Sequence, residues 1–73
     1  MKKVLIIDDE EKLRTLLARI ITLEGFEVTQ AADCKTGLQK LSRQTVDVVL
    51  CDVKLPDGSG VELSKIIKEK YPA

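Results

Sequence analysis

The chain has 73 residues, of which 44% are hydrophobic and 33% are charged, and this balance is typical of one small globular domain. Its 12 basic and 12 acidic residues cancel, and Lys and Arg do not gather on one segment, so neither nucleic acid nor an anionic membrane is favoured as a partner. The sequence contains no histidine and no Cys-x-x-Cys pair, which argues against a structural zinc site.

The two cysteines, Cys34 and Cys51, are interpreted as reduced thiols of a cytoplasmic protein. The start of the chain does not resemble a secretion signal, because only four apolar residues lie between Lys3 and Asp8. Cys51 lies in an apolar run, where a free thiol behaves as a small hydrophobic side chain; a redox or ligand role is the alternative.

The first predicted element is a strand over Lys3–Ile7, apolar without alternation, as in a parallel strand covered on both faces. Asp8 and Asp9 follow it directly. From Glu10 the apolar residues recur at helical spacing, which predicts an amphipathic helix ending at Gly25. The apolar positions of this helix are Leu13, Leu16, Leu17, Ile20 and Ile21.

The next segment, Phe26–Ala31, alternates apolar and polar residues and predicts an edge strand with one wetter face. Asp33 can cap a short helix over Cys34–Ser42. Gly37 inside this helix costs about 1 kcal/mol relative to Ala. The residues predicted to face inward are Cys34, Leu38 and Leu41.

A second apolar run, Val46–Cys51, predicts a strand buried on both faces, and it ends at Asp52. A Pro-Asp-Gly-Ser-Gly loop follows. Ser59 to Glu62 reads as a capping box that opens a third helix, which Pro72 ends. The residues predicted to face inward from this helix are Leu63, Ile66 and Ile67.

The predicted order, strand and helix alternating three times, specifies an α/β fold with parallel strands, right-handed crossovers and helices on both faces. If the first and third strands are neighbours, Asp8, Asp9 and Asp52 meet beyond their carboxyl ends, where such folds bind ligands. Carboxylates on strands about 4.8 Å apart repel, and a hard cation such as Mg²⁺ would relieve the repulsion. A carboxylate beside such a cation can act as a nucleophile toward phosphorus.

The plain alternative is that the acids from Asp8 to Glu11 only begin a helix and that Asp52 is only a loop acid. Two apolar strands that both end in aspartate within one short α/β chain argue against it.

The segments Val4–Glu10 and Val48–Gly60 resemble the acidic-pocket motifs of bacterial two-component response regulator receiver domains. The resemblance implies a flavodoxin-like sheet, here a truncated (βα)3 with strand order 2-1-3, and a sensor histidine kinase as partner. It implies that Asp52 is the phosphoacceptor and Asp9 the main Mg²⁺ carboxylate. Asp8 would bind the ion mostly through water, and the backbone carbonyl of Lys54 would complete the protein ligands.

Residues 1–73 correspond to the first three of the family's five β/α units, so we expect a partial receiver domain that lacks the last two units. The Ser/Thr and the Lys that contact the phosphoryl group in the family belong to those units. Only Mg²⁺ would then neutralise the phosphoryl charge, and phosphorylation is expected to be impaired.

Two functions therefore compete. The first is a non-enzymatic phosphoacceptor module; the second is a self-associating half-domain with a vestigial acidic site, held together as a homo-oligomer through the exposed edge of the third strand. A metal-dependent hydrolase is disfavoured, because no residue is placed to activate a water molecule.

Overall fold

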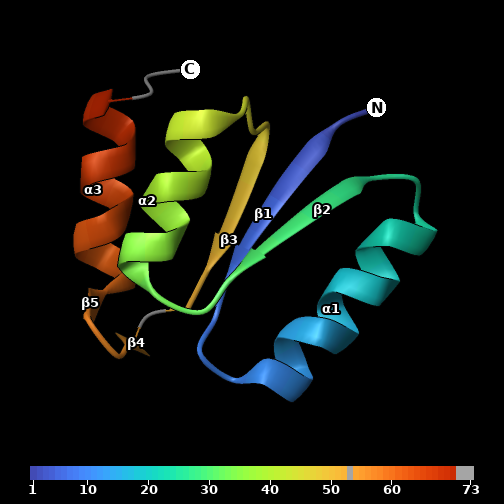
Figure 1. Ribbon diagram of the computed structural model, residues 1–73, viewed down its shortest axis with the longest axis horizontal. Coiled ribbons are helices and arrows are strands. Elements are labelled where there is room, and N and C mark those ends of the chain that lie inside the picture. Colours follow the sequence, from blue (N-terminus) through green and yellow to red (C-terminus); the bar gives the residue numbers. More distant parts are fainter. Residues whose placement is uncertain (53, 71–73) are drawn as a thin grey trace.

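The computed structural model describes residues 1–52 and 54–70, and it consists of a parallel sheet between two helical layers (Figure 1). A short antiparallel hairpin, β4 paired with β5, precedes the last helix. The elements in chain order are β1 (Lys3–Ile7), α1 (Glu11–Leu23), β2 (Glu27–Ala31), α2 (Cys34–Arg43), β3 (Val48–Cys51), β4 (Lys54–Leu55), β5 (Gly58–Ser59) and α3 (Gly60–Lys70).

The strand order β2-β1-β3, with both pairings parallel, confirms the predicted α/β fold and its order 2-1-3. Two further hydrogen bonds join β1 to the residue before β3 at the amino end of this pair. The N–H of Lys3 donates to Oδ2 of Asp47 at 2.7 Å, and the N–H of Asp47 donates to the carbonyl of Lys3 at 2.8 Å. This reciprocal pair helps to fix the β1–β3 register.

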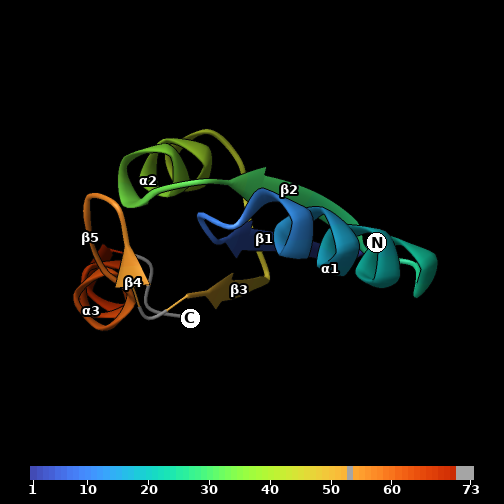
Figure 2. The same ribbon diagram turned by 90° about the horizontal axis from the view of Figure 1, so that it is seen from below.

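The central strand β1 is buried on both faces, as its unbroken apolar sequence predicts. Leu5 and Ile7 face α2 and α3, Val4 and Ile6 face α1, and all four are at most 4% exposed. Figure 2 shows α1 on one side of the sheet and α2 and α3 on the other. The core therefore lies in two layers around β1.

The helix α2 begins as the sequence predicts, because the side chain of Asp33 accepts a hydrogen bond from the N–H of Thr36 at 2.7 Å. Packing against β1 explains the glycine within this helix, Gly37. A Cβ on Gly37 would stand 2.6 Å from Cδ1 of Ile7, so any larger residue would force the Ile7 side chain or α2 to shift. Gly25 ends the α1 segment with φ +95°, the left-handed conformation that favours glycine.

Several expectations about the second half of the chain are wrong in detail. The hairpin β4–β5 was not predicted, and β3 begins at Val48 rather than Val46. Val48 and Leu50 are 43% and 41% exposed, so β3 is not buried on both faces. Val48 and Leu50 are the register partners of Val4 and Ile6, so they lie on the α1 side of the sheet. They are exposed because α1 packs on β1 and β2 and does not cover β3.

The helices also bury less than their apolar residues would allow. On α1 only Leu17, Ala18 and Ile21 pack on the sheet, while Leu13, Leu16 and Ile20 are exposed. On α3, Leu63 and Ile67 pack inward as predicted, but Ile66 is 39% exposed. The hydroxyl of Ser59 accepts a hydrogen bond from the N–H of Val61 at 3.2 Å, within the first turn of α3. The predicted stop at Pro72 lies outside the described residues.

None of the helices in the described part of the chain combines the length and the apolar character that crossing a lipid bilayer requires.

We expect Gly37→Ala to destabilise the chain by about 1 kcal/mol. Alanine is better than glycine in a helix by about 1 kcal/mol, but crowding a fully buried side chain such as Ile7 costs about 1–3 kcal/mol. Urea unfolding measures the difference. Gln39→Ala, at an exposed position of the same helix, is the control and should leave stability unchanged or slightly raised. A Gly37→Ala variant more stable than the unaltered chain would show that α2 can move away from β1 freely.

Candidate functional site

Backbone pairing continues beyond the ends of the strands and places Asp8 and Asp52 at the same level. Ile7 is the register partner of Cys51, and the N–H of Asp52 donates to the carbonyl of Ile7 at 2.9 Å. On the other side of β1, the N–H of Asp8 donates to the carbonyl of Ala31 at 3.0 Å. Both aspartates are thus held by the sheet itself, at its carboxyl end.

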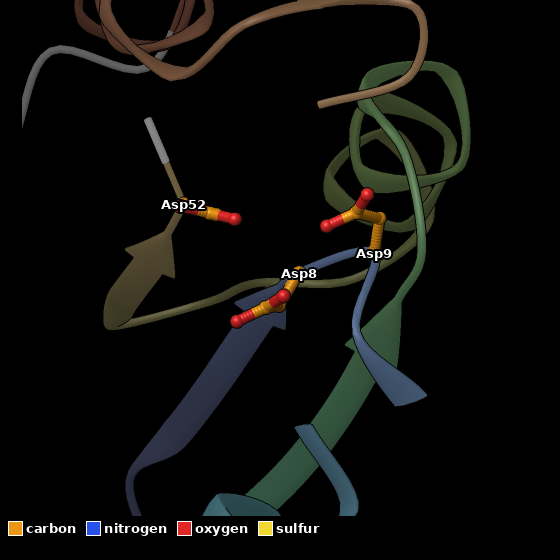
Figure 3. A group of neighbouring side chains, drawn as sticks. All are labelled: Asp8, Asp9 and Asp52. Atoms are coloured by element: carbon orange, nitrogen blue, oxygen red, sulfur yellow. The ribbon is translucent and has the colours of Figure 1, made fainter. Parts of the chain in front are cut away.

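The side chains of Asp8, Asp9 and Asp52 form one acidic cluster. One oxygen from each carboxylate lies within 4.8 Å of the others. Figure 3 shows the three carboxylates directed toward a common space beyond the ends of β1 and β3. The predicted meeting of these three acids is therefore what the structure shows.

The acid pair is held in place by two local contacts. The N–H of Glu10 donates to Oδ1 of Asp8 at 2.9 Å, which turns the chain into α1. From the second turn of α1, Arg14 donates from Nη1 to the carbonyl of Asp8 at 2.7 Å and from Nε to Oε1 of Gln30 at 3.0 Å. Arg14 thereby ties the loop after β1 to the end of β2.

The donor set of the cluster suits a hard cation. Three carboxylates so close together repel one another, and a divalent ion that prefers oxygen ligands would offset this repulsion. Mg²⁺ keeps several waters and needs only one or two protein carboxylates, which this solvent-accessible cluster can supply. The arrangement is therefore chemically able to bind Mg²⁺ and to bring a phosphoryl group to a carboxylate.

The chain after Asp52 enters the hairpin rather than an open loop. Lys54 opens β4 and pairs with Ser59, and Leu55 pairs with Gly58. Leu55 is 9% exposed and belongs to the core cluster beneath α2 and α3. The backbone of Lys54, expected to supply a ligand carbonyl, is thus part of an ordered turn two residues after Asp52.

Asp57, at the tip of the hairpin, reaches across to the first turn of α2. Its Oδ1 accepts from the N–H of Cys34 at 2.8 Å, and its Oδ2 accepts from the N–H of Lys35 at 3.0 Å. These two backbone donors lower the pKa of Asp57. Burial raises the pKa of the Cys34 thiol from its ordinary value of 9.0 to about 11, and a hydrogen bond to Asp57 adds to the shift.

Sequence reasoning found the three acids but missed the contacts of two residues in the segments next to them. Arg14 reads as an ordinary helix cation, and only its position one turn after the acid pair hints at a contact. Asp57 reads as a turn residue of a Pro-Asp-Gly segment, and nothing in the sequence links it to α2. Both Cys34 and Cys51 are free thiols packed against the core, as the inner helix face of Cys34 and the apolar run around Cys51 predict.

Comparison with known proteins identifies the family. Residues 4–73 match the family model described as the response regulator receiver domain. The chain belongs to this family. Its relatives include the DNA-binding transcriptional regulator NtrC of Proteus hauseri, 39% identical over 69 residues, which cover 94% of this chain and 15% of that protein. PhoP of Bacillus subtilis strain 168, an alkaline phosphatase synthesis transcriptional regulatory protein, is 35% identical over 69 residues, covering 94% of this chain and 29% of that protein.

Solved receiver structures show the same fold. The response regulator TrrA from Thermotoga maritima, in complex with Mg²⁺-BeF, superposes with a TM-score of 0.94 at 33% identity, over 99% of this chain and 63% of that one. TrrA in complex with the histidine kinase ThkA gives a TM-score of 0.93 at 33% identity, over 99% of this chain and 62% of that one. The chain therefore spans less than two thirds of these solved chains and a smaller share of the curated relatives.

We expect the Cys34 thiol to react slowly with iodoacetamide in the folded chain. A pKa of about 11 instead of 9.0 leaves about a hundredfold less thiolate at pH 8, and the thiolate is the reactive form. Peptide mass spectrometry follows the alkylation of Cys34 over time, with the urea-unfolded chain as control. Equal rates in the folded and unfolded chains would contradict the burial of this thiol and its contact with Asp57.

Proposed function

We propose that the chain is a phosphoacceptor module of a two-component system and that Asp52 accepts the phosphoryl group. Mg²⁺ would be held by the carboxylates of Asp8, Asp9 and Asp52 together with the backbone carbonyl of Lys54. The observation that carries this proposal is the acidic cluster, whose carboxylate oxygens lie within 4.8 Å of one another at the carboxyl end of the sheet. The complex of TrrA with Mg²⁺-BeF supports the choice of ion for the family.

In this proposal each residue has a separate task. An oxygen of Asp52 forms a bond to phosphorus while the bond from phosphorus to the donor nitrogen breaks, and the leaving nitrogen takes a proton. Asp9 and Asp8 would hold the ion. The hydrogen bond from the N–H of Asp52 to the carbonyl of Ile7 would fix the position from which the Asp52 carboxylate attacks phosphorus. When bound, Mg²⁺ supplies positive charge to the phosphoryl oxygens.

We infer that the donor is a sensor histidine kinase, on the strength of the complex in which TrrA is bound to the histidine kinase ThkA. Receiver domains are signalling modules, and we propose that this chain is likewise a phosphoacceptor rather than an enzyme. The two free thiols favour a reducing compartment, and we therefore propose the cytoplasm as its location.

We further propose that residues 1–73 form the first three β/α units of a receiver domain. Measured on these residues alone, phosphorylation should be weaker than in a five-unit receiver. The phosphoryl group would be neutralised by Mg²⁺ without a lysine or hydroxyl side chain from the last two units.

A second function, a self-associating half-domain, is favoured by the position of β3. Within residues 1–52 and 54–70, β3 is an outer strand of the parallel sheet, and its side chains Val48 and Leu50 are exposed. Two copies could pair through this edge as a two-fold dimer, with the acidic site unused.

The chain, incubated with Mg²⁺ and a small phosphoramidate donor, is expected to gain the mass of one phosphoryl group. Asp52→Asn should abolish the adduct, because the nucleophile is lost. Asp9→Asn should slow its formation by about a hundredfold, because charge stabilisation by the ion is worth several kcal/mol. Intact-mass analysis on a time course measures both effects, and EDTA should have the effect of Asp9→Asn or a larger one.

Asp47→Asn is the matched control, since Asp47 precedes β3 at the opposite end of the sheet and its amide oxygen can still accept from Lys3. It should be phosphorylated at the normal rate. An adduct that survives in Asp52→Asn would contradict the assignment of the phosphoacceptor. A chain that forms no adduct with Mg²⁺ present, yet sediments as a stable dimer, would favour the half-domain function instead.

A further inference from the structure

The first turn of α2 is bound by two carboxylates that come from different parts of the chain. Asp33 precedes the helix directly and accepts from the N–H of Thr36. Asp57 comes from the hairpin tip, more than twenty residues away, and takes the N–H groups of Cys34 and Lys35. Local sequence therefore provides one of the three caps, and the segment after Asp52 provides the other two.

The contact between the hairpin and α2 extends beyond these hydrogen bonds. A Cβ on Gly58 would stand 3.1 Å from the sulfur of Cys34, so the hairpin backbone lies directly on the start of the helix. Leu55 anchors the other side of the hairpin in the core. The hairpin is thus fixed at its base by Leu55 and at its tip by Asp57.

Lys54 lies between these anchors and the acidic cluster. It is two residues from Asp52, and its β-bridge partner, Ser59, follows Gly58. The hairpin tip that Asp57 holds on α2 is therefore joined to the backbone of Lys54 by a few residues and by the pairing of Lys54 with Ser59. Ligand carbonyls depend on such outer contacts for their orientation, and loss of an outer contact typically weakens metal binding about 10–100-fold.

We propose that Asp57 is a positioning residue that couples cation binding at Asp8, Asp9 and Asp52 to the order of the first turn of α2. This inference rests on the proposed function, because it takes the Lys54 carbonyl as a ligand of the ion. Coupling between two sites is reciprocal. A cation in the cluster should strengthen the two hydrogen bonds from α2 to Asp57, and loss of these hydrogen bonds should weaken cation binding.

The full chain and its Asp57→Ala variant are titrated with Mg²⁺ and followed by amide NMR. The Kd for Mg²⁺ is expected to rise about tenfold in Asp57→Ala. In the unaltered chain, Mg²⁺ should slow hydrogen exchange at the N–H groups of Cys34 and Lys35. In Asp57→Ala those groups should exchange quickly with or without Mg²⁺. Asp57→Asn keeps one acceptor oxygen and should give an intermediate Kd; it also serves if the alanine variant does not fold.

Asp33→Ala is the matched control. It removes a cap from the same helix turn but leaves both hydrogen bonds of Asp57 in place, so it should raise the Kd for Mg²⁺ much less than Asp57→Ala does. An equal rise of the Kd in Asp33→Ala and Asp57→Ala would overturn the coupling, since general loosening of α2 would explain both. Normal Mg²⁺ binding by Asp57→Ala would overturn the positioning role of Asp57 but would leave the proposed function intact. Failure of the unaltered chain to bind Mg²⁺ would contradict the proposed function, and the coupling with it.

Discussion

The parallel pairing of β1 with β3 is the constraint on which the rest of the molecule depends. It sets Ile7 opposite Cys51, and one further hydrogen bond, from Asp52 to Ile7, carries the register past the end of the strands. A shift of one residue would turn Asp52 to the other face of the sheet, away from Asp8 and Asp9. Register thus sets Asp52 beside Asp8, and the bend at Asp9, beside the contacts of Glu10 and Arg14 with Asp8, completes the acidic cluster.

The cluster stabilises nothing by itself, because like charges brought together oppose folding. The surrounding structure supplies the compensation. Four buried side chains of β1 provide the core of both layers. Arg14 holds the backbone after β1 from one side of the sheet, and Asp57 holds the segment after β3 from the other. Arg14 reaches the end of β1 from α1, and Asp57 ties the hairpin after β3 to the first turn of α2.

Sequence periodicity predicted the order and type of the main elements because burial and helix capping are local in origin. The unbroken apolar run of β1 and the cap at Asp33 are both present as expected. The same reasoning failed for β3, whose apolar run resembles that of β1 although Val48 and Leu50 are exposed. An apolar run shows that a strand can be buried, but whether each face is buried depends on which helices pack against it.

The candidate site divides in the same way. Its three acids follow from the rule that parallel strands bring their carboxyl ends together, so sequence alone predicted their meeting. The contacts of the neighbouring segments could not be predicted, because Arg14 donates to, and Asp57 accepts from, backbone groups that are distant in the sequence or belong to another element. Nearly every residue carries a backbone carbonyl and N–H, so residue identity does not show which of these groups a distant side chain will bind.

The most direct test of a cation site shared by the two strand ends is a titration of the chain with Mn²⁺ as a paramagnetic substitute for Mg²⁺, followed by amide NMR. We expect the signals of Asp8, Asp9 and Asp52 to broaden together at the same low Mn²⁺ concentration, and Asp9→Asn to remove the effect. Broadening confined to the first turn of α1, around Glu10 and Glu11, with the Asp52 signal unaffected, would contradict the claim that the two strand ends share one cation.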